Sequence, residues 1–397
     1  MVDLGVEIAG VYLKNPIVAA SATPTMNAKC MKKAIDAGAA AVVAKSLFGE
    51  SGRLGRRYPR PRFILVHWKD YPGYPKRLSP CFTLHSLEEC SPFDYEGYVK
   101  DINEAKKLIG DDGVVIASIS GSTLDEWEEL CEVVNSSKAD MVEVNVSCPF
   151  AAEMGIKMGA GAVEMAPEIT KVCRKTLALP FSVKLSPQVA DPIEVAKSVE
   201  EAGAYAVTLA ARLSGILIDV ETGRPRRWGS VGGYGGPYLI GYGLKWVYKA
   251  ALKLNIPIIA VMGVWGWRDI VSYIMVGAHA VQSAAAIMLR GYRVVGEWLR
   301  DIKAFMERKG YASLEDFRGV SLKYIKTTRE VERATPGVHA EVKYPEKCIG
   351  CRQCEVSCFY DAIKVVDGKA VVDIERCDGC GMCVEKCPTG AVVLTKP

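Results

Sequence analysis

The sequence predicts a (β/α)8 barrel, a TIM-barrel fold of the α/β class, followed by a small cysteine-rich α+β domain. Short β-branched runs alternate with amphipathic helical stretches from residue 1 to about residue 330, and eight such runs can be counted. Most of them are almost continuously apolar, as in strands that helices cover on both faces. An open doubly wound sheet is the alternative, but it needs a reversal of strand order that a sequence does not show. A third observation, eight cysteines after residue 347, sets the C-terminal part apart.

The eight expected strands are 17–21, 41–46, 114–119, 141–147, 181–186, 206–211, 257–263 and 280–286. The helices between them carry recognisable ends. Thr123 is expected to cap one helix, Asp191 and Pro192 to open another, and Gly203 to close it. We assign residues 1–333 to the barrel, 334–343 to a Pro- and Gly-containing linker, and 344–397 to the second domain.

Composition excludes several classes of protein. Of 397 residues, 49% are hydrophobic and 24% charged, which excludes disordered and fibrous chains. The net charge of +4 is too close to neutral to indicate nucleic-acid binding. No apolar run reaches the ~18 residues of a membrane span, and no signal peptide is recognisable, so we expect a cytoplasmic protein that binds neither membrane nor nucleic acid. Without an export signal, the clustered cysteines are interpreted as metal ligands.

Two cysteine quartets dominate the last 50 residues. The spacing Cys-x2-Cys-x2-Cys-x3-Cys begins at Cys348 and repeats 29 residues later at Cys377, and each quartet precedes a short apolar strand, 362–366 or 391–394. The pattern resembles the bacterial two-cluster ferredoxin, although Phe359 stands where that family often has proline. The resemblance assigns one [4Fe–4S] cluster to Cys348, Cys351, Cys354 and Cys387, and the other to Cys377, Cys380, Cys383 and Cys358. Structural zinc bound by the same cysteines is the alternative.

Polar residues gather where the expected barrel strands end, which is where barrel active sites lie. One strand ends in Lys45-Ser46, and another continues into Asn145-Val-Ser-Cys148-Pro149. With these residues, the chain resembles the dihydroorotate dehydrogenase and dihydropyrimidine dehydrogenase family of FMN barrels over residues 1–300, and Asn-x-Ser-Cys-Pro is the most specific motif. The arrangement of such a barrel with a two-cluster ferredoxin module fused at its C-terminus resembles the last two domains of dihydropyrimidine dehydrogenase, and also smaller bacterial and archaeal subunits with the same arrangement.

The resemblance implies a role for each matching residue. Cys148 would be the acid/base that moves a proton at the substrate carbon, and Asn145 would contact both flavin and substrate. Lys45 and Lys184 would place positive charge near the flavin ring. The remaining expected FMN contacts, including backbone N–H groups for the phosphate, are Ala20, Ser21, Gly236, Gly263, Ala284 and Ala285. Met262 and the Ala284-Ala285 pair depart from the family, and Gly236 ends a glycine-rich segment, 232–236, that is interpreted as a loop.

The substrate positions depart from the family further. Thr83, His85, Ala211 and Arg212 stand where asparagine, glutamate and hydroxyl-bearing residues are expected. We expect Thr83, His85 and Arg212 to contact substrate, with Arg212 binding a carboxylate or phosphate. An ion pair for Arg212 and a surface position for His85 are the alternatives. Arginines in 52–62 and at 224–227 favour an anionic substrate, a partner contact or simple solvation.

These observations predict an FMN- and iron–sulfur-dependent oxidoreductase that acts on a CH–CH or C=C bond next to a carbonyl, as dihydroorotate and dihydropyrimidine dehydrogenases do. The chain lacks a nicotinamide-binding Gly-x-Gly-x-x-Gly unit, so its two clusters are expected to exchange electrons with a flavoprotein reductase or a ferredoxin. By resemblance, a homodimer or hetero-oligomer is expected. The alternatives are the same chemistry on an anionic non-pyrimidine substrate, and an electron-relay subunit of a larger complex.

Overall fold

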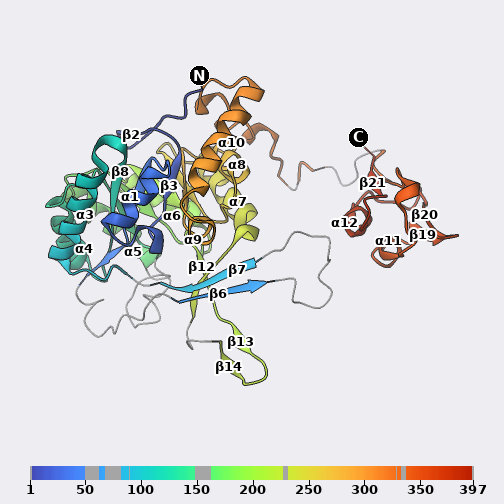
Figure 1. Ribbon diagram of the computed structural model, residues 1–397, viewed down its shortest axis with the longest axis horizontal. Helices are drawn as coiled ribbons and strands as arrows, with labels where there is room; N and C mark the ends of the chain where they lie inside the picture. Colours follow the sequence, from blue (N-terminus) through green and yellow to red (C-terminus); the bar gives the residue numbers. More distant parts are fainter. Residues whose placement is uncertain are drawn as a thin grey trace. The chain divides into compact units, whose positions relative to one another are not determined.

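The computed structural model describes residues 2–49, 62–67, 82–88, 90–147, 162–226, 231–327, 329–331 and 337–395. The chain divides into two units (Figure 1), the first spanning 1–67 and 81–323 and the second containing 324–397. Each unit is described by itself. None of the helices in the described residues is both long and apolar enough to cross a bilayer.

Eight parallel strands close into a barrel, which confirms the predicted fold. In the order in which they pair, they are β3 (Ile17–Ala19), β4 (Ala41–Val43), β8 (Val114–Ser120), β9 (Met141–Asn145), β10 (Phe181–Lys184), β11 (Ala206–Leu209), β16 (Ile258–Val261) and β17 (Ala280–Ser283). Pairing of β17 with β3 closes the circle. The short strand β5 (Leu47–Phe48) pairs with the end of β8. All eight strands begin within one residue of the runs that the sequence predicts. Seven of them end two or three residues earlier than predicted, and β8 ends one residue later.

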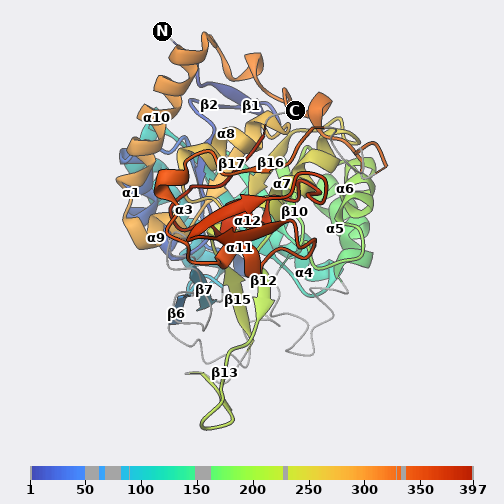
Figure 2. The same ribbon diagram turned by 90° about the vertical axis from the view of Figure 1, so that its right-hand side faces the viewer.

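Helices surround these strands (Figure 2), and the apolar core fills the layer between them. They are α1 (Ala28–Asp36), α3 (Tyr95–Ile109), α4 (Leu124–Asn135), α5 (Ala162–Thr176), α6 (Pro192–Glu201), α7 (Ile240–Ala251), α8 (Trp267–Met275), α9 (Ala285–Arg290) and α10 (Val294–Lys309). The expected caps are present: the side chain of Thr123 accepts a hydrogen bond from Glu126 N at 3.2 Å, and that of Asp191 from Ile193 N at 2.9 Å. Gly203, after α6, has a φ of +100°, a backbone conformation that favours glycine.

An antiparallel sheet joins three segments of the first unit that are distant in sequence. Its strand order is β12 (Leu213–Gly215), β15 (Gly232–Gly235), β7 (Phe82–Leu87) and β6 (Arg62–His67). The expectation of a loop at 232–236 was therefore wrong for its first four residues. Glycine is needed in this strand because a Cβ at Gly232 would lie 2.7 Å from His85 Nε2, and one at Gly233 would lie 2.4 Å from Arg212 Cζ.

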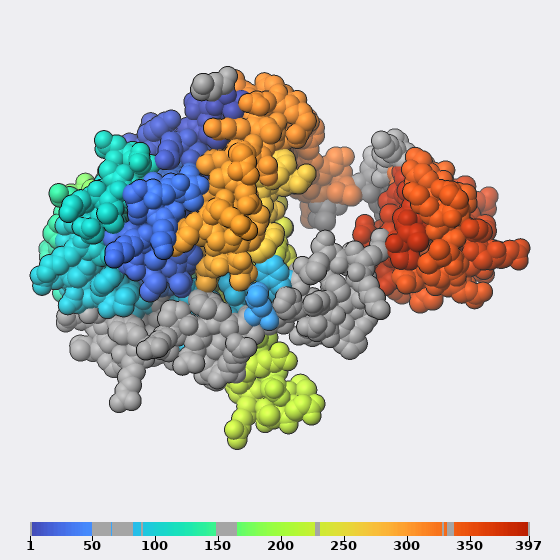
Figure 3. Space-filling view, in the orientation of Figure 1, coloured from blue at the N-terminus to red at the C-terminus, as the bar shows by residue number. Residues whose placement is uncertain are grey.

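Two small hairpins complete the first unit. Strands β1 (Val6–Ile8) and β2 (Val11–Leu13) pair near the N-terminus. Strands β13 (Ile218–Asp219) and β14 (Arg224–Pro225) form a hairpin that projects from the barrel, seen in Figure 3 as a yellow-green lobe. Arg224 and Arg226 are placed on or beside this hairpin, whereas Arg227 and residues 52–61 lie outside the described residues.

In the described residues of 324–397, the second unit has two short α-helices and two strand pairs. Helices α11 (Gln353–Val356) and α12 (Met382–Lys386) each carry the third cysteine of a quartet, Cys354 and Cys383. Strand β19 (Ile363–Val366) pairs with β20 (Lys369–Val372), and β18 (Ala340–Glu341) pairs with β21 (Val393–Leu394). Strand β18 lies within the segment 334–343 that the sequence analysis interprets as a linker.

Candidate active site

A cavity opens at the carboxyl ends of the barrel strands. Its space, including solvent at the mouth, is about 1260 Å³. Strand ends from most of the barrel contribute to its wall, as expected for an active site of this fold. The predicted residues that line it are Ala20, Ser21, Lys45, Asn145, Lys184, Arg212, Gly236, Gly263, Ala284 and Ala285.

Three other predicted residues need separate treatment. Cys148 lies outside the described residues, so its predicted catalytic role stays a prediction. Thr83 and His85 are buried in β7, and they are not among the described residues that line the cavity. Side chains alternate along a strand, and here Leu84 and Ser86 take the cavity side. Burial lowers the pKa of His85, whose Nε2 lies 3.0 Å from Gly215 O.

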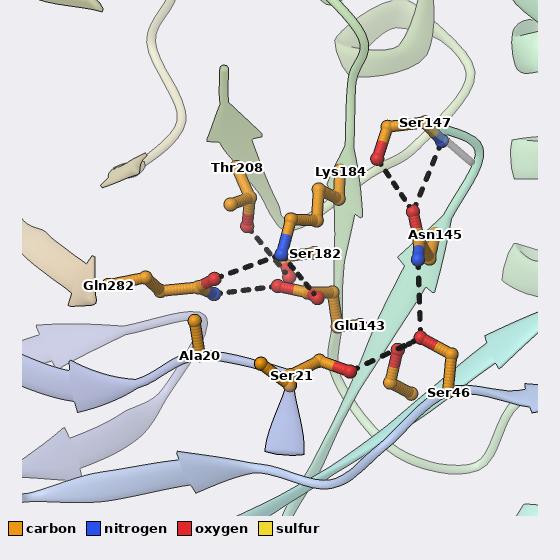
Figure 4. Close-up of polar contacts among 12 residues, drawn as sticks. Ala20, Ser21, Ser46, Glu143, Asn145, Ser147, Ser182, Lys184, Thr208 and Gln282 are labelled. Atoms are coloured by element: carbon orange, nitrogen blue, oxygen red, sulfur yellow. Dashed lines mark hydrogen bonds and ion pairs between the residues drawn. The ribbon is translucent and has the colours of Figure 1, made fainter. Parts of the chain in front are cut away.

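Lys184 belongs to a ring of three buried polar side chains in the barrel interior (Figure 4). Its Nζ lies 3.1 Å from Glu143 Oε1 and 3.1 Å from Gln282 Oε1. Gln282 Nε2 donates to Glu143 Oε2 at 2.6 Å, which closes the ring. The three side chains come from β10, β9 and β17, and all three residues are at most 7% exposed.

Hydroxyl groups orient the amide of Asn145. The backbone N–H of Ser147 can only donate, and it lies 3.1 Å from Asn145 Oδ1, which also accepts from Ser147 Oγ at 2.7 Å. The Nδ2 group therefore points to Ser46 Oγ, 3.2 Å away. Ser46 Oγ in turn contacts Ser118 Oγ at 2.8 Å and Ser21 Oγ at 3.3 Å. These contacts determine which amide atom is a donor at this wall of the cavity.

The guanidinium of Arg212 is already paired with a carboxylate of the protein, whereas the sequence predicts that it binds an anionic group of the substrate. Its Nη1 lies 3.6 Å from Glu88 Oε2 and donates to Ser86 Oγ at 2.6 Å, and its Nη2 donates to Glu88 O at 3.2 Å. Burial disfavours the charge on Glu88, but Lys45, Arg212 and hydrogen bonds from Thr23 outweigh it and lower the Glu88 pKa. The alternative of an ion pair for Arg212 is thus what the structure shows.

Neighbouring backbone segments come close together at two points of the cavity wall. A Cβ on Gly263 would lie 2.4 Å from Ile240 N, and one on Gly236 would lie 2.4 Å from Phe82 O, so only glycine fits at either point. Ser283, which lines the cavity beside Ala284, has a buried Oγ with no hydrogen-bond partner within the described ranges. An orphaned hydroxyl next to crowded backbone suits an acceptor-rich group such as a phosphate.

In the second unit, all eight quartet cysteines are free thiols. Backbone N–H groups point at the first and fourth sulfur of each quartet. Ala370 N and Ala391 N donate to Cys348 and Cys387 at 3.4 and 3.2 Å. Their counterparts in the other half, Ala340 N and Ala362 N, donate to Cys377 and Cys358 at 3.3 and 3.4 Å.

The thiols fit the iron–sulfur ligands that the sequence predicts. Each predicted cluster would receive one matched pair of N–H···S bonds, a contact that stabilises ligand thiolates. Burial and the nearby thiols Cys377 and Cys380 raise the pKa of Cys383 to about 11. Such a crowded group of sulfurs needs a cation to hold it deprotonated, which a cluster supplies.

Fold and sites together define a redox protein of the α/β-barrel class, with a substrate-sized cavity and a thiol-rich electron-transfer unit. Comparison with known proteins identifies its family. Residues 95–306 match the family model described as dihydroorotate dehydrogenase, and residues 347–391 match the 4Fe-4S dicluster domain. The chain belongs to the dihydroorotate dehydrogenase family, oxidoreductases that act on CH–CH donors.

Relatives with the printed name dihydroorotate dehydrogenase B (NAD(+)), catalytic subunit, support this membership. The protein from Methanosarcina mazei is 34% identical over 315 residues, which cover 79% of this chain and 94% of the relative. The protein from Pyrococcus abyssi is 31% identical over 320 residues, or 81% of this chain and 99% of the relative. Because the matches take nearly all of each relative but leave part of this chain unmatched, this chain is the longer one.

The sequence analysis missed several cavity and barrel-interior residues. Glu143, Gln282, Glu88 and Ser46 were not among its candidates. Glu143 carried a usable signal, because a charged residue inside an apolar strand needs a partner when it is buried. Ser46 stood at a polar strand end, whereas Glu88 and Gln282 carried no such signal, since their importance comes from residues far away in sequence.

Proposed function

We propose that this protein is an FMN- and [4Fe–4S]-dependent oxidoreductase that transfers hydride between FMN and a carbon–carbon bond next to a carbonyl. The observation that carries this proposal is the cavity at the barrel strand ends, where Lys184, Lys45 and Asn145 converge in a chain of this family. FMN, which the family binds, would supply a two-electron acceptor that can release its electrons singly. Two clusters in the second unit would pass those electrons on.

Each cavity residue has a proposed task. Cys148 takes the proton from one substrate carbon as hydride leaves the neighbouring carbon, so that a C=C bond forms. Asn145 presents its amide to flavin and substrate in the orientation that Ser46 and Ser147 impose. Lys184 and Lys45 stabilise negative charge that develops on reduction. Ala20 and Ser21 would border the flavin, and its phosphate would be met by Ser283 and the backbone at Gly236, Gly263, Ala284 and Ala285.

The clusters are assigned by the crossed ligand pattern. Cys348, Cys351, Cys354 and Cys387 would hold one, and Cys377, Cys380, Cys383 and Cys358 the other. The internal duplication and the dicluster family match support a count of two. The N–H···S bonds at the first and fourth sulfurs of both quartets support these cysteines as thiolate ligands, and the crossing itself rests on the resemblance to two-cluster ferredoxins.

Dihydroorotate is the first substrate to test, because the relatives carry its name. One observation favours a second candidate, an anionic non-pyrimidine substrate. Within the described residues, Asn145 is the one asparagine that lines the cavity, and Ser86, Ala211 and Arg212 line it elsewhere. Pyrimidine edges alternate donors and acceptors and suit amides, whereas this wall offers a hydroxyl and a guanidinium that Glu88 already pairs, so its lining argues against a pyrimidine more than it argues for an anion.

The electrons would leave through a partner protein. The relatives are named as catalytic subunits of an NAD(+)-linked enzyme, which implies a second subunit in those proteins. A flavoprotein reductase or a ferredoxin would take that place here, in a cytoplasmic assembly. NADH or NADPH added to the purified chain alone is therefore expected not to reduce the flavin at a useful rate.

Replacement of Cys148 tests the chemical step. Cys148→Ala should abolish reduction of bound flavin by dihydroorotate while dithionite still reduces flavin and clusters. Cys30→Ala, which removes a thiol of helix α1 that does not line the cavity, should behave like the unmodified protein. Unchanged flavin reduction in Cys148→Ala would contradict the proposed role of Cys148. A wild-type flavin that dithionite reduces but no substrate reduces would instead favour the electron-relay alternative.

A further inference from the structure

The ring of Glu143, Lys184 and Gln282 spans the barrel interior. Strands β9 and β10 are neighbours, and Ser182 of β10 is in register with Glu143. Strand β17 is separated from them by β11 and β16 in the barrel order, so Gln282 reaches them across the interior rather than along the sheet. The ring borders the cavity, because Lys184 and Gln282 line it, and we call this part of its wall the cavity floor.

The ring has a strict balance of donors and acceptors. Lys184 donates twice, to Glu143 and to Gln282, and the Gln282 amide donates once, to Glu143. Both carboxylate oxygens of Glu143 accept a hydrogen bond, and the ring has no further acceptor to which a carboxyl proton could donate. The ammonium has three N–H bonds and spends two in the ring, which leaves the third for whatever occupies the cavity.

The ring also has a balance of charge. One carboxylate offsets one ammonium, and a buried charge without such a partner is strongly destabilising. The carboxylate lies deeper than the ammonium, because Glu143 is fully buried and Lys184 borders the cavity. The cavity floor therefore presents a positive charge that the residue behind it partly cancels.

We propose that Glu143 and Gln282 are positioning residues which aim Lys184 at the bound flavin and set how strongly its charge favours the reduced, anionic flavin. This inference rests on the proposed FMN site. Glu143 and Gln282 act through Lys184, so their effect is on the equilibrium between oxidised and reduced flavin and not on the proton that Cys148 takes.

Four variants separate charge from packing. Glu143→Gln changes the formal ring charge from 0 to +1, and Gln282→Glu changes it to −1. The double variant Glu143→Gln/Gln282→Glu returns the charge to 0 and restores the donor count, because the new amide at position 143 can donate to the new carboxylate at position 282 while Lys184 donates to both. Gln282→Met is the matched control, since it keeps the length of the side chain and the charge of the ring but loses the hydrogen bonds.

The experiment measures the midpoint potential of FMN bound to each full-length variant in an anaerobic redox titration. At one fixed potential near the wild-type midpoint, the ratio of reduced to oxidised flavin should rise about tenfold or more in Glu143→Gln and fall by a similar factor in Gln282→Glu. The double variant should return to within a few-fold of wild type, and Gln282→Met should move less than either charge variant. A merely structural role would shift both single variants alike and would not be rescued by the exchange.

The outcomes are distinct for the two proposals. If the wild-type apoprotein, titrated with FMN, does not quench FMN fluorescence, the proposed flavin site is wrong. If FMN binds but the ratios do not follow the sign of the ring charge, the positioning role is overturned. If neither single variant folds, the double variant decides: the proposal requires it to fold and hold FMN at a near-wild-type potential, and its failure overturns the proposal.

Discussion

Replacement of Glu88 and Arg212 tests whether their ion pair stabilises the cavity wall. Arg212 Nη1 lies 3.6 Å from Glu88 Oε2, and the side chains are 32% and 4% exposed. At an effective dielectric constant of ~20, the direct attraction at this distance is about 4 kcal/mol. Desolvation of Glu88 and solvent around Arg212 reduce the net coupling to about 1–2 kcal/mol.

The single variants should cost more than this coupling. Arg212→Met leaves a buried carboxylate with Lys45 and Thr23 as its remaining described partners, and we expect a loss of about 2–3 kcal/mol in unfolding free energy. In the wild type, Thr23 N donates to the Glu88 carboxylate at 2.8 Å. Glu88→Gln keeps an oxygen that can accept this bond, and it should cost about 2 kcal/mol in unfolding free energy. The double variant should cost about 1–2 kcal/mol less than the sum of the two.

Tryptophan fluorescence makes the assay specific for the first unit. Six of the seven tryptophans fall in the ranges of the first unit and none falls in 324–397, so urea unfolding followed by this signal reports the barrel and not the cysteine-rich segment. Unfolding free energies of the wild type and the three variants close a double-mutant cycle. Additivity within about 0.3 kcal/mol would refute the ion-pair argument and return Arg212 to the role of a free anion receptor.

Three further predictions follow from single residues. Burial lowers the pKa of His279 to about 4 in the folded protein, so as the pH falls the unfolded chain takes up this proton before the folded protein does. Between pH 6.5 and 4, the wild-type free energy of unfolding should therefore fall by about 3 kcal/mol more than that of His279→Asn. Parallel curves of unfolding free energy against pH for the two proteins would contradict this. Gly263→Ala, at a φ of +72° against the Ile240 backbone, should cost about 3 kcal/mol or more in urea unfolding and weaken FMN binding, and wild-type stability would refute the close contact. Cys387→Ser should lower bound iron from about eight to about four atoms per chain, and an unchanged iron content would contradict the assignment of Cys387 as a cluster ligand.

The sequence was sufficient for the architecture because the barrel depends on local patterns. Continuous apolar runs such as 41–43 and 258–261 identify strands covered on both sides, and caps such as Asp191 mark where helices begin. The same logic failed at Gly232–Gly235, where four residues rich in glycine form a strand. Glycine is required there by the neighbouring side chains of His85 and Arg212, which no local pattern reveals.

The site was harder to predict from the sequence because it depends on the face of a strand to which each side chain points and on partners that are distant in sequence. Thr83 and His85 lie in the expected segment, but one residue of strand register puts Ser86 on the cavity instead. Lys184 stood out as a charged residue in an apolar strand. Its partner Gln282 comes from the other end of the barrel segment, and only closure of the barrel brings the two together.

Anaerobic titration of the purified chain with dihydroorotate, followed at the flavin absorbance and then at the cluster absorbance, tests whether this barrel oxidises dihydroorotate at a bound flavin. Dihydroorotate should bleach the flavin, and the clusters should be reduced in turn without a second protein. A flavin that dithionite bleaches but dihydroorotate leaves oxidised would contradict it, and would direct attention to anionic non-pyrimidine donors.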